Sequence, residues 1–124
     1  MRLLLDTRAV LWWLADEGLT TQARDAIADP ANLVAVSAVS AWEISIKKAL
    51  GKLSAPEDLE QQIHSNGFVP LPINISHGAA AGRLDRHHED PFDRMLVAQA
   101  LAEGLTIVTR DNRFADYGVA LLPA

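Results

Sequence analysis

Short apolar runs alternate along the chain with longer stretches in which apolar residues recur at helical spacing. The runs are too short for helices and predict β-strands at 3–5, 33–36, 68–71, 105–108 and 119–122. The longer stretches predict helices over 9–14, 21–28, 40–50, 56–65, 77–84 and 92–103. Strands that alternate with helices in this way are typical of an α/β fold with a parallel sheet.

Local signals mark where several of these helices begin and end. Thr20 or Thr21 can cap the helix over 21–28, and Pro30 stops it, since a proline disfavours helical geometry in the residue before it. Ser76 is expected to cap the helix over 77–84. Gly104 follows the helix over 92–103, because glycine most easily adopts the left-handed conformation at a helix C-terminus.

The composition favours a single domain over residues 1–124. With 124 residues and 49% hydrophobic content the chain can bury a real core, which excludes a disordered tail. It has no cysteine, so disulfides, zinc–thiolate sites and thiol nucleophiles are excluded. The apolar start reaches Asp6 after three leucines, and no later stretch could cross a bilayer. We expect a soluble, cytoplasmic protein.

Two acidic residues follow predicted strands. Asp6 comes directly after the strand over 3–5, and Asp111 closely follows the strand over 105–108. The carboxyl ends of parallel strands meet at one edge of a sheet, where connecting loops and helix N-termini also converge. We therefore expect both carboxylates at that edge.

Two further acids lie on the inner faces of predicted helices. Asp93 has Leu96, Val97 and Ala100 at helical spacing, so it should share their core-facing side. By the same spacing, Glu43 shares a face with Ile46 and Leu50. A carboxylate in such a position is costly unless something positive binds it.

Each acid alone also has a plain interpretation as a cap. Ser40 to Glu43 matches a capping box, and Asp90 with Asp93 fits an N-cap followed by a first-turn acid. Asp6 and Asp111 could likewise cap the segments after them. Four acids that converge on one place favour a common metal site over four separate caps, because carboxylates close together resist ionisation without a counter-ion. Asp90 stays open between metal ligand and cap.

Carboxylate ligands without histidine or cysteine favour a hard cation, Mg²⁺ or Mn²⁺, over zinc or iron. Such an ion recruits phosphate oxygens and can activate water for hydrolysis of a phosphodiester, so no protein nucleophile is required. This interpretation assigns metal-binding and catalytic roles to Asp6, Glu43, Asp93 and Asp111.

The net charge of −5 argues against capture of nucleic acid by the whole surface but permits a local site. Basic residues near the acids in sequence fit either the rim of a phosphate channel or plain solvated surface: Arg83, Arg86, His87, His88, Arg94, Arg110 and Arg113. For the two histidines individually we expect solvent exposure. Lys47 lies near the end of its helix, where a cation complements the dipole.

The tryptophans are expected in different settings. Trp12 and Trp13 are adjacent, so one should pack in the core and the other could line a partner groove. Trp42 has Ile46 and Ala49 at helical spacing, which predicts a place in the core.

Four stretches of the chain match a known pattern in order and spacing. They are LLLDT at 3–7, SAVSAWEI at 37–44, DPFDRML at 90–96 continued by Ala98 to Ala100, and VTRD at 108–111. In this combination the chain resembles the PIN-domain ribonucleases, specifically the VapC toxins of bacterial toxin–antitoxin pairs. The resemblance covers nearly the whole sequence.

The resemblance implies a PIN-like three-layer α/β/α fold with a central four- or five-stranded parallel sheet. It implies Mg²⁺- or Mn²⁺-dependent endonucleolytic cleavage of RNA and inhibition by a small VapB-type antitoxin, in a homodimer or a hetero-oligomer with that antitoxin. Asp6, Glu43, Asp93 and Asp111 would then be the acid quartet. Thr7, Ser37 and Thr109 would supply hydroxyls that orient ligands or substrate.

One position departs from the family pattern. Many relatives have histidine after the Asp-Thr pair, whereas this chain has Arg8. Arg8 could pair with a cluster acid or contact a phosphate. With Arg94 and Arg110 it forms our set of candidate RNA contacts.

Other functions fit the sequence less well. A receiver-type phosphoacceptor domain also has this size and a Mg²⁺ site, but the chain has no adjacent acid pair after the first strand and no lysine at the end of the late strand. A haloacid-type phosphatase would need a second aspartate two residues after Asp6, where Arg8 stands. A catalytically silent binding protein with the PIN fold stays open as an alternative.

Overall fold

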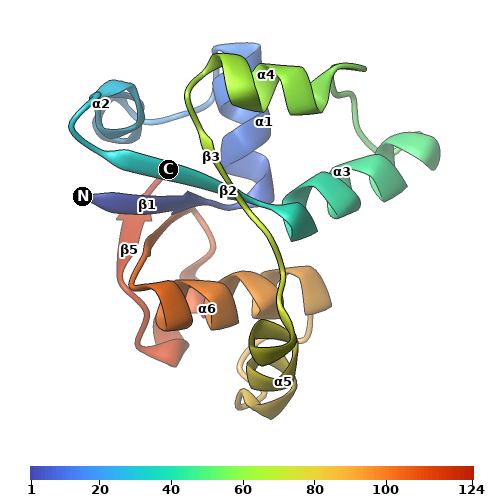
Figure 1. Cartoon of the computed structure of the whole chain (residues 1–124), viewed down its shortest axis with the longest axis vertical. Coiled ribbons are helices and arrows are strands. Elements are labelled where there is room, and N and C mark those ends of the chain that lie inside the picture. The colour runs from blue at the N-terminus through green and yellow to red at the C-terminus, as the bar shows by residue number, and fades with distance from the viewer.

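A five-stranded sheet runs through the middle of the computed structural model, which describes residues 1–124 (Figure 1). The strands are β1 (Arg2–Leu5), β2 (Leu33–Ser37), β3 (Val69–Leu71), β4 (Thr106–Thr109) and β5 (Leu121–Pro123). They pair in the order β3-β2-β1-β4-β5, and every pair is parallel. The predicted α/β fold with a parallel sheet is confirmed, with five strands.

Helices cover both faces of this sheet. They are α1 (Thr7–Ala15), α2 (Thr21–Ala28), α3 (Ala38–Ala49), α4 (Leu59–Ser65), α5 (Ile75–Arg83), α6 (Pro91–Glu103) and the 3₁₀ helix η1 (Asn112–Tyr117). In Figure 1, α1, α2 and α4 lie above the sheet, whereas α6 lies below it with α5 packed against α6. The arrangement has the three layers that the family resemblance implies.

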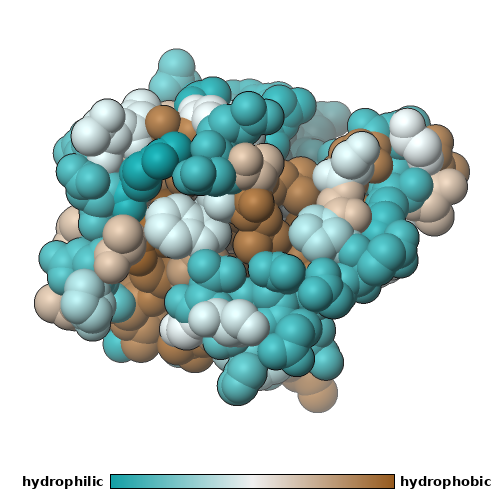
Figure 2. All heavy atoms as spheres, turned by 90° about the horizontal axis from the view of Figure 1, so that it is seen from above, coloured by the Kyte–Doolittle hydropathy of each residue, from teal (hydrophilic) through white to brown (hydrophobic).

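Alternation along the strands divides the apolar side chains between two cores. In β1, Leu3 and Leu5 join the core under α1, α2 and α4, whereas Leu4 joins the core against α6. All three leucines are fully buried, as expected for a central strand covered on both faces. Figure 2 looks onto the side that α1, α2 and α4 cover and shows mainly hydrophilic side chains, with apolar atoms gathered in its middle.

The strand order separates this fold from the receiver-type alternative. In the receiver arrangement the strand order is 2-1-3-4-5. Here β1 is central, between β2 and β4, and β3 forms an edge. The receiver-type interpretation is therefore wrong. None of the helices is both long and apolar enough to cross a bilayer.

Several helices begin elsewhere than predicted. Ser37, whose hydroxyl accepts the Val39 N–H at 3.0 Å, caps α3, so Ser40 lies inside the helix and the predicted capping box is wrong. Asn74 and His77 cap α5 reciprocally, which replaces the predicted Ser76 cap. Helix α4 starts at Leu59 rather than residue 56, and the 3₁₀ helix was not predicted.

The tryptophans also differ in part from expectation. Trp42 is 60% exposed and packs edge-on against Phe92, so its predicted place in the core is wrong. Trp13 packs against Phe68, with a distance of 5.9 Å between ring centroids. Trp12 lies partly buried next to the same core and faces the carboxyl edge of the sheet, where it lines a cavity.

Candidate active site

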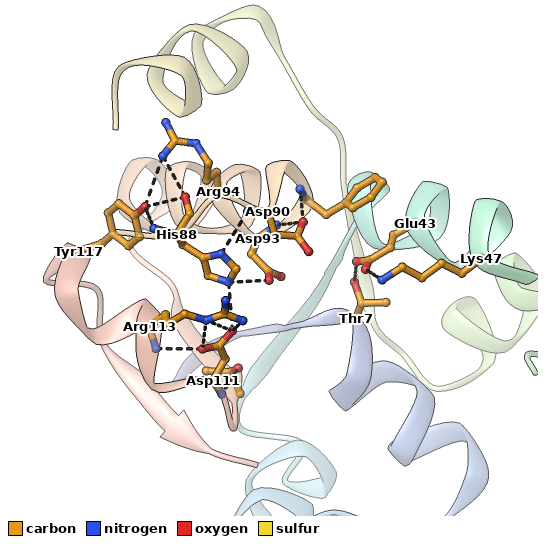
Figure 3. A network of polar contacts seen from close by, with 12 residues as sticks. Thr7, Glu43, Lys47, His88, Asp90, Asp93, Arg94, Asp111, Arg113 and Tyr117 are labelled. Atoms are coloured by element: carbon orange, nitrogen blue, oxygen red, sulfur yellow. Dashed lines mark hydrogen bonds and ion pairs between the residues drawn. The ribbon is translucent and has the colours of Figure 1, made fainter. Parts of the chain in front are cut away.

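The four predicted acids line one cavity of about 450 Å³ at the carboxyl edge of the sheet. Asp6 follows β1, Glu43 projects from α3, Asp93 lies in the first turn of α6, and Asp111 follows β4 by two residues. Figure 3 shows Glu43 and Asp93 on facing sides of this space, with Asp111 below Asp93. Among the lining residues only Trp12 and Phe114 are apolar. Segments distant in sequence thus bring four carboxylates together.

Asp6 and Glu43 are the most buried of these acids, with 7% and 5% exposure. Asp6 Oδ1 accepts the Ala9 N–H at 2.8 Å and so caps α1, and the Thr109 side chain also hydrogen-bonds to Asp6. Burial raises the pKa of Asp6, against the opposing effect of these hydrogen bonds. The site therefore holds the Asp6 carboxylate in a position where its ionisation is costly.

Two neighbouring side chains hold Glu43 in place. The Thr7 hydroxyl donates to Glu43 Oε1 at 2.6 Å and is 3.1 Å from the Ser40 hydroxyl. Lys47 Nζ pairs with Glu43 Oε2 at 2.5 Å, one helical turn further along α3. Lys47 is therefore part of the site, beyond the dipole role expected from its sequence position.

Asp93 and Asp111 lie next to each other but have opposite pKa shifts. Burial, followed by repulsion from Asp90 and Glu43, raises the pKa of Asp93 to about 7. Hydrogen bonds from the Arg113 guanidinium lower the pKa of Asp111 to about 2. Asp111 thus has an arginine in direct contact as its counter-ion, whereas Asp93 has no lysine or arginine in direct contact.

Asp90 also lines the cavity, and it caps α6. Its Oδ1 accepts the N–H groups of Phe92 at 2.8 Å and Asp93 at 3.4 Å. Asp111 likewise caps η1 by accepting the Arg113 N–H at 2.9 Å. The two interpretations of these acids, cap and cavity residue, are therefore compatible in the same side chain.

His88 is a site residue that the sequence did not reveal. It is only 3% exposed, and its Nε2 lies 2.9 Å from Asp93 Oδ2 and 3.0 Å from Asp111 Oδ2 (Figure 3). The expected solvent exposure holds for His87 but is wrong for His88. His88 lies in a loop without apolar periodicity, so no sequence signal indicated its burial.

Two of the three candidate RNA contacts lie at this cavity. Arg8 and Arg110 line it, together with Lys47 and Arg113. The Arg110 guanidinium stacks on Trp12 at 3.9 Å from the ring centroid, and its Nε donates to the Ala124 carbonyl at 2.8 Å. A basic rim therefore surrounds the acidic interior.

Arg94 and Ser37 lie away from this cavity. Arg94 points away from the acids in Figure 3 and donates to five acceptors, which are the Tyr117 hydroxyl and the carbonyls of Ala81, Leu84, Asp85 and His88. Its donors are used within the fold, so we remove it from the candidate RNA contacts. The Ser37 hydroxyl instead donates to Gln99 Oε1 at 2.5 Å beneath the sheet edge.

Comparison with known proteins assigns the chain to a family. The PIN domain family matches residues 3–120. The chain belongs to the PIN domain family. Among proteins of known name, this PIN domain is 29% identical over 122 residues to Ribonuclease VapC22 of Mycobacterium tuberculosis, with 92% of this chain and 90% of that protein covered.

Solved structures of low sequence identity share the same fold as this PIN domain. VapBC2 from Rickettsia felis, bound to a DNA fragment from its promoter, has a TM-score of 0.72 at 16% identity, covering 98% of both chains. A toxin–antitoxin complex from Klebsiella pneumoniae has a TM-score of 0.66 at 21% identity, covering 97% of this chain and 95% of that one. FitAcB from Neisseria gonorrhoeae has a TM-score of 0.63 at 20% identity, covering 98% of this chain and 96% of that one.

The donor chemistry of this PIN domain fits a hard divalent cation. Carboxylate oxygens dominate the interior of the cavity, and burial, followed by mutual repulsion among them, raises the pKa of Asp93. A bound cation would remove that repulsion. Only His88, Asp93 and Asp111 have potential ligand atoms all within 4.8 Å of one another, whereas Asp6 and Glu43 line the same cavity outside this group.

Proposed function

We propose that this PIN domain is an endoribonuclease that depends on Mg²⁺ or Mn²⁺, with Asp6, Glu43, Asp93 and Asp111 as its metal-binding and catalytic residues. The observation that carries the proposal is the lining of one cavity by four carboxylates from four separate segments. The family and the similarity to a protein named as a ribonuclease support it.

The side chains of the site have different roles in the proposed phosphodiester hydrolysis. A bound divalent ion supplies a more acidic water and neutralises charge on the phosphate. Thr7 and Lys47 fix the two oxygens of Glu43, while Thr109 and the start of α1 fix Asp6. The basic rim of Arg8, Arg110 and Arg113 is suited to the phosphates on either side of the cleaved bond.

We further propose that the protein acts in the cytoplasm as the toxin of a toxin–antitoxin pair, as one PIN domain over residues 1–124. The similarity to Ribonuclease VapC22 and the fold shared with chains of toxin–antitoxin complexes support this role. The partner would be a small VapB-type antitoxin, in a homodimer of the toxin or a hetero-oligomer with the antitoxin. A catalytically silent PIN-fold protein is the alternative that experiment has to exclude.

The direct test is cleavage of RNA by the purified protein with Mg²⁺ or Mn²⁺. We expect Asp6→Asn and Asp93→Asn to reduce the rate by at least about a hundredfold, because a metal ion contributes several kcal/mol of charge stabilisation. Asp25→Asn, at an exposed position on α2, is the matched control and should cleave at the native rate. Cleavage that survives a chelator or both site variants would reject the proposal.

The toxin role has its own readout in the same set of variants. Expression of the native chain should arrest growth, Asp6→Asn should not, and the product of the small open reading frame beside the gene should relieve the arrest. If native and Asp6→Asn chains arrest growth equally, nuclease activity is not the cause.

A further inference from the structure

His88 is held at the site by contacts that do not use its ring nitrogens. Its backbone N–H donates to the Tyr117 hydroxyl at 2.9 Å, and its carbonyl accepts from Arg94 Nη1 at 3.3 Å. The ring packs edge-on against Phe114, with a distance of 5.8 Å between centroids. The fold therefore places this imidazole between Asp93 and Asp111 by contacts that do not use its two ring nitrogens.

The hydrogen bonds of the ring fix its tautomer. Nδ1 accepts the Asp90 N–H at 3.2 Å, so this nitrogen carries a lone pair and no proton. The proton of the neutral ring is then on Nε2, from which it is donated to Asp111 Oδ2, with Asp93 Oδ2 at 2.9 Å from the same nitrogen. An imidazolium would direct a second N–H at the Asp90 N–H and lose that contact.

This tautomer decides what His88 can do beside a metal. A protonated Nε2 has no lone pair to offer, so His88 cannot be a ligand through that atom, although its distances to Asp93 and Asp111 would suit one. It instead donates to Asp111 Oδ2 and lies 2.9 Å from Asp93 Oδ2. Asp93 Oδ1 has no hydrogen-bond partner within the protein and stays available to a cation.

We propose that His88 is a positioning residue, which donates its Nε2 proton to Asp111 and holds Asp93 Oδ2 against the same ring nitrogen, so that Asp93 Oδ1 is left toward the cavity while His88 does not itself bind the metal. The inference rests on the proposed metal-dependent function of this site. Asp90 has a part in it through its backbone, because its N–H selects the tautomer.

Nuclear magnetic resonance of the native protein tests the tautomer without any change to the site. Long-range ¹H–¹⁵N spectra report which ring nitrogen of each of the four histidines carries a proton, and His88→Gln assigns the His88 signals by their loss. We expect Nε2 of His88 to be protonated in chelator and to stay protonated when Mg²⁺ is added. Loss of that proton on addition of Mg²⁺ would mean direct ligation and overturn the proposal.

Variants test the consequence for metal binding through the Mn²⁺-dependent rise in melting temperature. His88→Ala should weaken Mn²⁺ binding by about tenfold or more, the effect expected for a group that orients a metal ligand. His88→Gln, which keeps an N–H donor, should retain more of the affinity. His87→Ala is the control, because the neighbouring ring is exposed and its only acidic neighbour is Asp85, outside the four candidate ligands.

Failure of this inference and failure of the proposed function give different results. If His88→Ala binds Mn²⁺ as tightly as the native protein while RNA cleavage remains metal-dependent, only the positioning role is wrong. If His88→Ala weakens Mn²⁺ binding but the native protein does not cleave RNA, the positioning role stands and the nuclease proposal falls. Should His88→Ala not fold, the spectra of the native protein still decide.

Discussion

The acids at the carboxyl edge can cap a helix and still offer an oxygen to the proposed cation, because a carboxylate has two oxygens. Asp6 caps α1 through Oδ1, and Asp90 caps α6 through Oδ1. Glu43 has both oxygens held, by Thr7 and by Lys47, whereas Asp93 keeps Oδ1 free. The acids thus differ in how many carboxylate oxygens remain without a partner in the protein. Asp93 has such an oxygen, Oδ1, and no lysine or arginine in direct contact.

Asp93 should make the metal-free protein less stable as the pH rises. Its pKa is about 7 in the folded state against 3.8 unfolded, so the folded state binds more protons between these values and stability is lost as pH rises through them. In chelator, Asp93→Asn should therefore melt at a higher temperature than the native protein at pH 8. The gain should shrink as the pH falls from about 7 toward 3.8.

Melting curves between pH 5 and 8 in chelator measure this difference, with Asp25→Asn as the exposed control. Added Mn²⁺ should reverse the order, because an ion that binds only the folded native protein stabilises it by mass action. An unchanged difference between native protein and Asp93→Asn over the whole pH range would contradict the assigned cause.

At the scale of elements, the N-cap of α6 is Asp90, which also lines the cavity. Asp90→Ser should keep α6 intact, since serine is as good a cap as aspartate, whereas Asp90→Ala should cost about 1 kcal/mol of unfolding free energy. If Asp90 acts only as a cap, the Mn²⁺-dependent rise in melting temperature should survive in Asp90→Ser. Thermal melts of both variants with and without Mn²⁺ measure this. A rise lost in Asp90→Ser, as in Asp93→Asn, would make Asp90 a ligand.

The sequence predicts the elements well where a periodic pattern matches a buried face. The leucines of β1 and the inner face of α6 at Leu96, Val97 and Ala100 are buried as expected. The position of Asp6 and Asp111 after two strands also predicted correctly that they lie at one edge of the sheet. The carboxyl ends of parallel strands all lie at that edge.

The predictions that were wrong concern features that depend on tertiary contacts and not on the local sequence. Ser37 and Ser40 are both good cap residues, but Thr7 hydrogen-bonds to Ser40 inside the core and Ser37 takes the cap. The burial of His88 depends on Phe114 and Asp111, which are distant in sequence. Neither the choice of cap nor that contact has a periodic signature.

At the scale of the whole molecule, the fold concentrates positive charge that the composition does not suggest. The net charge is −5, yet Arg8, Lys47, Arg110 and Arg113 all line the cavity. Three of them are engaged with neighbours, Lys47 with Glu43, Arg110 with Trp12 and Arg113 with Asp111. Arg8 is exposed and has no hydrogen-bond or ion-pair partner in the fold, so it is the rim cation most available to RNA.

The dependence of cleavage on salt should therefore report on Arg8. Each phosphate contact to single-stranded RNA adds about 0.7 to the steepness with which log(kcat/KM) falls against log[KCl]. At saturating Mn²⁺, Arg8→Ala should lower kcat/KM and reduce that slope by about 0.7.

Arg2→Ala is the matched control, because Arg2 begins β1 at the opposite edge of the sheet and donates to the Glu103 carbonyl there. Since removal of either arginine changes the net charge by the same amount, equal slopes for the two variants would show that overall charge governs the effect. A smaller slope for Arg8→Ala alone would place the phosphate contact at the cavity.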